Sequence, residues 1–423
     1  MSALLRRLLL LLYSLSPGIA KLSGIDAMFG VGLLLLALYF ALLKPVGDRG
    51  PVSQIGIRAM LLVFVGYALA LGSLLWLVGM AHEWTLVVGL ISFVVPLAFA
   101  AVAGPGRCAR LLDDLPLVAA FHAIVALAIY PPLRADIAWL NSAADALLEG
   151  TLAFRLATVS GSLALSSVMV VAFALTLRQH LSSAPGSAVS RLTWCGASLF
   201  LLCTLLSLQR AAWVALLLIV VVAVITAPSG RRRSLGVMLA ITFAPLLVVL
   251  STVDLPEGAL DVVLERLDTV LGRGEVGAVA ERSDQWGHVA HNFVNLPIGY
   301  GPGQLGQAAR DVRPREGGLP IFDGDYFRIV SEYGVVGVAL VVLILASLAA
   351  ALRKLYRALQ RRDARGDSLL SAAALGLMLQ GIGTNVTELY FANTLFWSLL
   401  LLQWHAPLPT RRAATGAQPV QVA

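Results

Sequence analysis

Long runs of apolar residues, separated by short polar segments, make up most of this chain. Twelve of them approach or reach the roughly 17 to 25 residues that a helix needs to cross a bilayer. Because hydrocarbon offers the backbone no hydrogen-bond partner, each run is predicted to be a helix that satisfies its own amides. The predicted spans are residues 4–20, 26–43, 56–79, 85–104, 112–130, 160–180, 190–207, 210–227, 235–252, 328–352, 368–385 and 388–405.

Composition excludes an ordinary soluble protein. Of the 423 residues, 58% are hydrophobic and 13% are charged, whereas soluble domains have about a quarter charged. The sequence therefore predicts an all-α polytopic membrane protein, with the lipid bilayer as its first partner. The first run follows a basic start, "MSALLRR", as in a signal peptide, but no convincing cleavage site follows it. We interpret it as an uncleaved span.

Basic residues set the expected orientation, because they accumulate on cytoplasmic loops. The segments "GRRRS" and "RKLYRALQRRDARGD" place both termini in the cytoplasm. The net charge of +7 then reflects topology, and nucleic acid is not expected as a partner. Cys108 is expected on an inner loop and the other two cysteines inside a helix, so neither a disulfide nor a metal cluster is predicted.

This topology divides the chain into four parts. They are a nine-span bundle (1–252), a large periplasmic loop (253–327), three C-terminal spans (328–405) and a disordered cytoplasmic tail (406–423). The loop holds half of the 24 acidic residues and is expected to carry the function. We predict two short helices in it. An amphipathic one at 258–273 lies on the membrane surface or packs on the bundle, and a second at about 278–295 ends before Pro297.

Two arginines are candidates for binding an anion. Arg210, next to Gln209 in "SLQRAAW", either sits at a helix boundary for steric reasons or faces the bundle and grips a phosphate with its paired donors. Arg282 either forms a structural salt bridge or binds the phosphate together with Arg210. The glycines of "GYGPGQLG", with Gly301 and Gly303 at the centre, predict a tight bend whose exposed amides could cradle a phosphate. No Lys-Ser/Thr follows them, which excludes a nucleotide site.

The segment "DGDYFRIVSEYGVVG" carries the other candidates. Asp323 and Asp325 could cap a helix, act as a catalytic base or hold a metal ion. Tyr326 and Arg328 follow them, and Arg328 is spaced for an i, i+4 pair with Glu332. Two further pairs stay open: His288 and His291 favour surface or packing positions over metal binding, and Asn385 and Glu388 either line the same cavity or cap helices.

The order of these motifs over residues 200–345 resembles the O-antigen ligase and O-antigen polymerase superfamily. The resemblance implies a lipid-linked glycosyltransferase of the bacterial inner membrane that needs no cofactor and works at the periplasmic face. Its donor would be a glycan on undecaprenyl diphosphate, its acceptor another glycan or lipid A core, and a chain-length regulator is a candidate partner. The two arginines that such proteins use for the diphosphate map onto Arg210 and Arg282.

One position departs from the ligase pattern, which resembles His-Asn-x-Tyr/Leu leading to Glu-x-Gly. Counting back from Glu332, Asp323 stands at the histidine position and Gly324 at the asparagine position. This favours polymerisation of repeat units over ligation, with Asp323 as the base and Asp325 and Tyr326 orienting the acceptor or Arg328. A secondary transporter and a non-catalytic scaffold are the alternatives from other classes; no internal repeat supports the first.

Overall fold

We analysed a computed structural model of the full chain. The structure describes residues 3–23, 27–43, 52–81, 83–130, 156–158, 161–184, 186–252, 287, 289–291, 293–294, 296–306, 324–361 and 367–404. Within these ranges the chain is helical and forms no strand. The all-α prediction is confirmed for this part of the chain.

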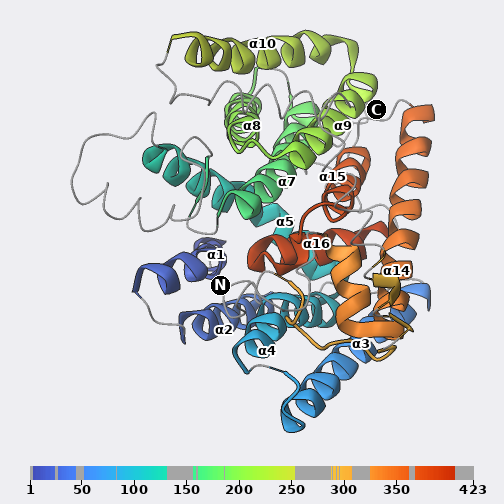
Figure 1. Ribbon diagram of the computed structural model, residues 1–423. Helices are drawn as coiled ribbons and strands as arrows, with labels where there is room; N and C mark the ends of the chain where they lie inside the picture. Colours follow the sequence, from blue (N-terminus) through green and yellow to red (C-terminus); the bar gives the residue numbers. More distant parts are fainter. Residues whose placement is uncertain are drawn as a thin grey trace, which may run out of the picture.

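Each predicted apolar run overlaps a helix, and helices from distant parts of the chain pack side by side (Figure 1). In chain order the elements are α1 (Ala3–Ser23), α2 (Ala27–Leu42), α3 (Val52–Leu77), α4 (Glu83–Gly89), the π-helical turn η1 (Leu90–Val94), α5 (Val95–Ile129), α7 (Gly161–Ser182), α8 (Ala188–Leu206), α9 (Arg210–Thr226), α10 (Ser229–Thr252), α14 (Asp325–Arg361), α15 (Asp367–Gln380), the 3-10 turn η2 (Val386–Glu388) and α16 (Tyr390–Gln403).

The predicted loop between residues 104 and 112 is wrong. The chain there kinks at Gly104, with φ 70° and ψ 172°, and continues as helix in α5. Pro105 suits such a restart, because a first-turn residue needs no amide hydrogen. Cys108, expected on an inner loop, is instead buried inside α5.

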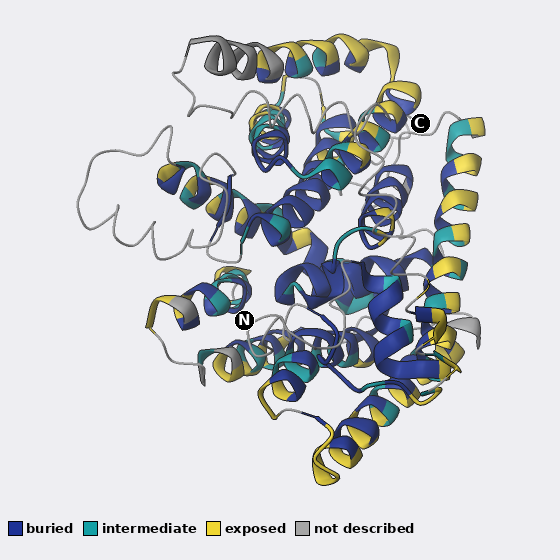
Figure 2. Cartoon of the chain, in the orientation of Figure 1, coloured by how far each residue is buried: buried dark blue, intermediate teal, exposed yellow. Residues whose placement is uncertain are grey.

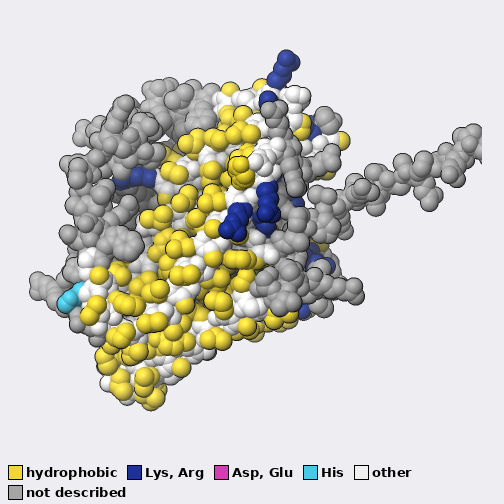
Figure 3. All heavy atoms as spheres, turned by 90° about the vertical axis from the view of Figure 1, so that its right-hand side faces the viewer, with side chains coloured by type: hydrophobic (Ala, Val, Ile, Leu, Met, Phe, Trp, Pro, Cys, Tyr) yellow, Lys and Arg dark blue, Asp and Glu magenta, His cyan; other side chains and the backbone are white. Residues whose placement is uncertain are grey.

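In the part of the chain that the structure describes, six helices are long and apolar enough to cross a membrane. They are Ala3–Ala20, Ile55–Leu77, Glu83–Ile129, Gly161–Ser182, Ala188–Leu206 and Asp325–Gln360, and shorter apolar helices accompany them. Figure 3 shows one face of the molecule, on which most of the described side chains are hydrophobic, with a few Lys and Arg among them. The protein is thus a membrane protein, while the number of twelve spans stays a prediction.

The centre of the bundle is formed by α7, α15 and α16, whose side chains are buried almost throughout (Figure 2).

A polar anchor, made of hydrogen bonds to Asp114, holds the N-terminal helices to α5. Asp114 of α5, 2% exposed, accepts hydrogen bonds from Arg6 Nε at 3.3 Å, Arg7 Nε at 3.2 Å and the Tyr39 hydroxyl at 3.1 Å. The anchor ties α1 and α2 to α5.

Candidate functional site

The glycine bend at 297–306 packs against a kink in α14. Gly334, with φ 55°, interrupts the helix, so the carbonyls of the preceding turn can accept bonds from other amides. The amide of Tyr300 donates to Ser331 at 3.0 Å, and that of Gly301 donates to Glu332 at 2.8 Å. Val335 in turn donates to Pro297 at 2.9 Å. The bend and the kink therefore form one backbone-paired unit.

The expectation that the amides of this bend are exposed is wrong for residues 301–306, which are buried. The amide of Leu305 donates to the Glu332 carboxylate at 3.0 Å, so the bend cradles a carboxylate of the protein itself. Gly301 and Gly303 have φ of 93° and 71°. Gly303 also lies against the backbone of α4, where close approach leaves no room for a side chain. Their predicted contact with a phosphate is not tested.

Gly303→Ala is expected to destabilise the protein by about 2 to 4 kcal/mol, from left-handed strain and overpacking. A β-carbon at 303 would lie 2.0 Å from the carbonyl oxygen of Thr85. Gly230→Ala in α10 is the matched control, because a β-carbon there meets nothing within 4 Å and alanine favours the helix. The unfolding midpoints of the two purified variants in detergent check this. Equal unfolding midpoints for the two variants would show that the bend accommodates a side chain at residue 303 without loss of stability.

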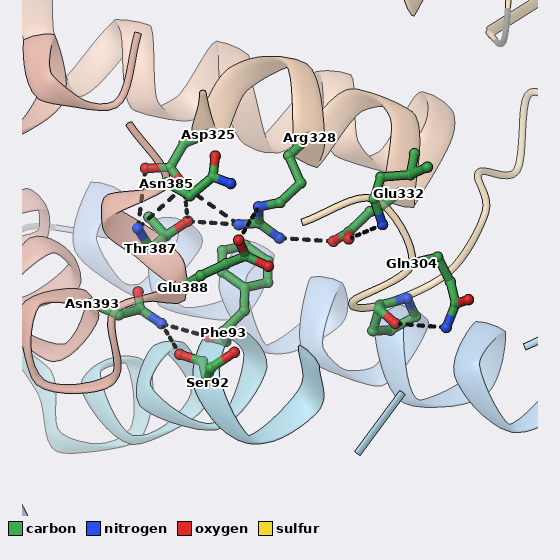
Figure 4. Close-up of polar contacts among 12 residues, drawn as sticks. Ser92, Phe93, Gln304, Asp325, Arg328, Glu332, Asn385, Thr387, Glu388 and Asn393 are labelled. Carbon is green, nitrogen blue, oxygen red and sulfur yellow. Dashed lines mark hydrogen bonds and ion pairs between the residues drawn. The ribbon is translucent and has the colours of Figure 1, made fainter. Parts of the chain in front are cut away.

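A buried ion cluster occupies the start of α14 (Figure 4). Its centre is the guanidinium of Arg328, which is fully buried. Arg328 Nη1 donates to Glu332 Oε2 at 2.7 Å, and Nη2 lies 3.4 Å from Asp325 Oδ1. Nε faces Glu388 Oε2 at 3.8 Å. The predicted i, i+4 pair of Arg328 and Glu332 is confirmed, and Glu388, whose position the sequence left open, lies beside this pair.

Thr387 joins the C-terminal turn to this cluster. Its hydroxyl accepts a bond from Arg328 Nη2 at 2.7 Å and donates to Asp325, and its amide donates to Asp325 Oδ2 at 3.1 Å. Asn385 Oδ1 accepts from the amide of Gly324 at 2.8 Å. The side chain of Asp325 thus binds the turn before α16 as well as Arg328 in the first turn of its own helix.

The cluster is unbalanced in charge, because three carboxylates surround one guanidinium. Asp325 and Glu332 are fully buried and Glu388 is 9% exposed. Removing ions from water is costly unless each finds partners, which explains the dense hydrogen bonding here. Arg328 and Asp325 were predicted to contact substrate. Their complete burial favours a positioning role, and only Glu388 reaches the edge of the cluster.

The turn before Arg210 contains a residue with an uncommon backbone conformation. α8 ends at Leu206 and α9 begins at Arg210, as predicted for a tight turn between two spans. Leu208 in this turn has φ 53°, a left-handed conformation that is rare outside glycine and often marks functional sites. Gln209 and Arg210 are both half-buried.

The C-terminal part of α15 packs against α9 and approaches the ion cluster. A β-carbon at Gly376 would come within 2.5 Å of the methyl group of Ala215, in the second turn of α9. One at Gly381 would lie 3.2 Å from the carboxylate of Asp325. The hydroxyl of Tyr326, a half-buried residue of α14, donates to the carbonyl of Met378 in α15 at 2.5 Å. Through α15, the starts of α9 and α14 belong to one region of the molecule.

Three of the predicted features lie outside the described residues: Arg282, Asp323 and the amphipathic helix at 258–273. The described part of the second predicted loop helix is helical, and its Val289 packs with Leu305 and Phe327. This contact brings the described part of that helix next to the start of α14. His291 is exposed, and His288 is outside the described residues.

The structure is that of a helical membrane protein in which α9, preceded by the cationic turn 207–210, and α14, which carries the buried ion cluster, both pack against α15. Residues 195–342 match the model of a protein family described as O-antigen ligase. The matched range includes Gln209, Arg210 and the glycine bend, and ends in α14 beyond Gly334. It confirms the resemblance to the O-antigen ligase and polymerase superfamily and supports a glycan-transferring enzyme in general. A search of the curated proteins found no match to the chain.

Sequence reasoning missed two members of the cluster. Thr387 was overlooked between Asn385 and Glu388, although its place in the same polar turn was a usable signal. Phe93, whose ring centroid lies 4.6 Å from the Arg328 guanidinium carbon, gave no signal at all within an apolar run.

Proposed function

We propose that the protein polymerises O-antigen or exopolysaccharide repeat units at the periplasmic face of the bacterial inner membrane. The donor is a glycan chain on undecaprenyl diphosphate, and the acceptor is a hydroxyl of the next lipid-linked unit. The observation that supports this most is that a single family match spans both the cationic turn before α9 and the α14 members of the ion cluster, Asp325, Arg328 and Glu332. The aspartate at position 323 favours polymerisation over transfer to lipid A core.

In the proposed reaction, Arg210 and Arg282 bind the diphosphate of the donor. The acceptor hydroxyl oxygen attacks the anomeric carbon from the face opposite the diphosphate, and Asp323 takes the hydroxyl proton. The bond from the anomeric carbon to the diphosphate oxygen breaks, and its electron pair leaves with the diphosphate. The two guanidinium groups stabilise that growing charge without a metal ion, and the configuration at the anomeric carbon inverts.

The ion cluster holds the start of α14 in this scheme. Asp323 directly precedes Gly324, whose amide is bound by Asn385 at 2.8 Å. The amide of Asp325 donates to the carbonyl of Gly381 at 2.8 Å. Two hydrogen bonds to the connection between α15 and η2 thus fix the backbone next to the proposed base.

The decisive experiment supplies the purified protein with undecaprenyl-diphosphate-linked repeat units alone, without lipid A core, nucleotide or added metal. A ladder of longer glycans supports the polymerase. Transfer that occurs only after lipid A core is added makes the protein a ligase. No transfer with either acceptor contradicts the proposal and favours transport of the lipid-linked glycan.

Asp323→Asn is expected to lower the rate of transfer about 10² to 10⁴-fold, since an amide cannot accept the proton. The ladder assay measures this at saturating donor. Asp113→Asn, at an exposed aspartate of α5, serves as the control and should keep the wild-type rate. If both variants kept full activity, Asp323 would not be the base.

A further inference from the structure

The π-helical turn Leu90–Val94 lacks one of the usual helical donors to its backbone carbonyls. Single π-turns are frequent at functional sites. Pro96 is the second residue after this turn. Its nitrogen carries no hydrogen, so the carbonyl of Ser92, four residues earlier, cannot receive the usual helical bond.

Asn393 of α16 supplies the missing donor. Its amide nitrogen donates to the carbonyl of Ser92 at 2.6 Å and to that of Phe93 at 3.1 Å (Figure 4). Asn393 is fully buried, and its helix packs against both the turn and α5. One side chain therefore holds two carbonyls of the turn from a helix 300 residues away in sequence.

The held turn places Phe93 against the ion cluster. The ring of Phe93 faces the guanidinium of Arg328, with 4.6 Å between the guanidinium carbon and the ring centroid. Tyr333 and Trp397 pack around the same ring, with centroids at 5.5 Å and 6.0 Å. Carboxylates occupy the edges of the Arg328 guanidinium, whereas the Phe93 ring lies against its face. Phe93 therefore orients the plane of the guanidinium through a cation–π contact.

We infer that Asn393 is a positioning residue of the transfer site. By holding the carbonyls of Ser92 and Phe93, it fixes the ring that orients Arg328, and Arg328 in turn fixes the start of α14 beside Asp323. Asn393 does not touch substrate in this scheme. The inference rests on the proposed function for its kinetic consequence, whereas the coupling of Asn393 to Phe93 is a property of the fold alone.

The test is a double-mutant cycle between Asn393→Leu and Phe93→Leu in the purified protein. We expect each change to lower kcat roughly tenfold per folded molecule, with the KM for the lipid-linked donor nearly unchanged, and the double variant to be no slower than either single one. Phe93→Trp, which keeps an aromatic face, should restore most of the rate. Asn393→Ser, which keeps one donor, serves if Asn393→Leu does not fold and should be intermediate.

Gln403→Leu is the matched control, because Gln403 is a buried amide on the same helix whose bonds go to Ser371 and Leu399. It should lower stability without changing kcat. Multiplying effects in the double variant, or full kcat in Asn393→Leu, would overturn the inference. If the wild-type protein transfers no glycan, the proposed function fails first. The coupling is then read from the unfolding midpoints, where additive changes would overturn it.

Discussion

Arg328→Leu will destabilise the protein by about 3 to 5 kcal/mol, the range found when one partner of a buried ion pair is removed. The change leaves Asp325, Glu332 and Glu388 buried around an apolar side chain. The guanidinium also bonds Thr387, so one of the links between α14 and the turn before α16 is lost with it. The unfolding midpoint in detergent and the yield of monodisperse protein measure the effect.

Arg353→Leu is the control for this experiment. Arg353 is exposed on the same helix and has no hydrogen bond or ion pair among the described residues, so its loss should change stability by less than about 0.5 kcal/mol. A further variant combines Arg328→Leu with Asp325→Asn, Glu332→Gln and Glu388→Gln. Because no charge stays buried in it, part of the stability should return. If Arg328→Leu is as stable as the control, the cluster does not hold α14.

Arg210→Ala will lower the rate of glycan transfer about 10² to 10³-fold, the usual loss when one donor to a developing anion is removed. The fold should survive, since Arg210 is only half-buried at the start of α9. Arg210→Lys should also be slow, because a single ammonium group cannot reproduce the paired donors of a guanidinium. Initial rates of ladder formation at saturating acceptor measure both variants.

Arg191→Ala provides the comparison for Arg210. Arg191 is an exposed arginine near the beginning of α8, whereas Arg210 follows the end of that helix. The change removes the same charge from the protein and should leave the rate within about twofold. A rate within threefold of wild type for Arg210→Ala would remove Arg210 from the mechanism.

Hydropathy predicted the helices well, because a helix in hydrocarbon depends on its own composition. It failed at residues 105–111, where Arg107 and Arg110 suggested a loop. The structure instead has a kink at Gly104, after which the helix resumes at Pro105, so Arg107 and Arg110 are helical. Local polarity does not distinguish a loop from a polar stretch inside a helix.

The site could be predicted only where its contacts are local in sequence. The pair of Arg328 and Glu332 follows from helical spacing. The bonds of Asp325 to Thr387 and of Asn393 to Ser92 depend on tertiary packing, about which periodicity carries no information. The bend shows the same limit: Gly301 and Gly303 were correctly expected to form a tight turn, but the partner of that turn is Glu332, a residue of the protein.

The ion cluster has a consequence for how the protein is made. Asp325 and Thr387 are 62 residues apart, so the charged start of α14 leaves the ribosome well before its partners do. Each charge costs about 2.5 to 3.5 kcal/mol when it enters the centre of a membrane helix without a partner. We therefore expect this end of α14 to stay at the water interface until α15 and α16 have been synthesised. The C-terminal helices would then be the last part of the bundle to be assembled, and chains truncated before residue 385 should be degraded and not accumulate.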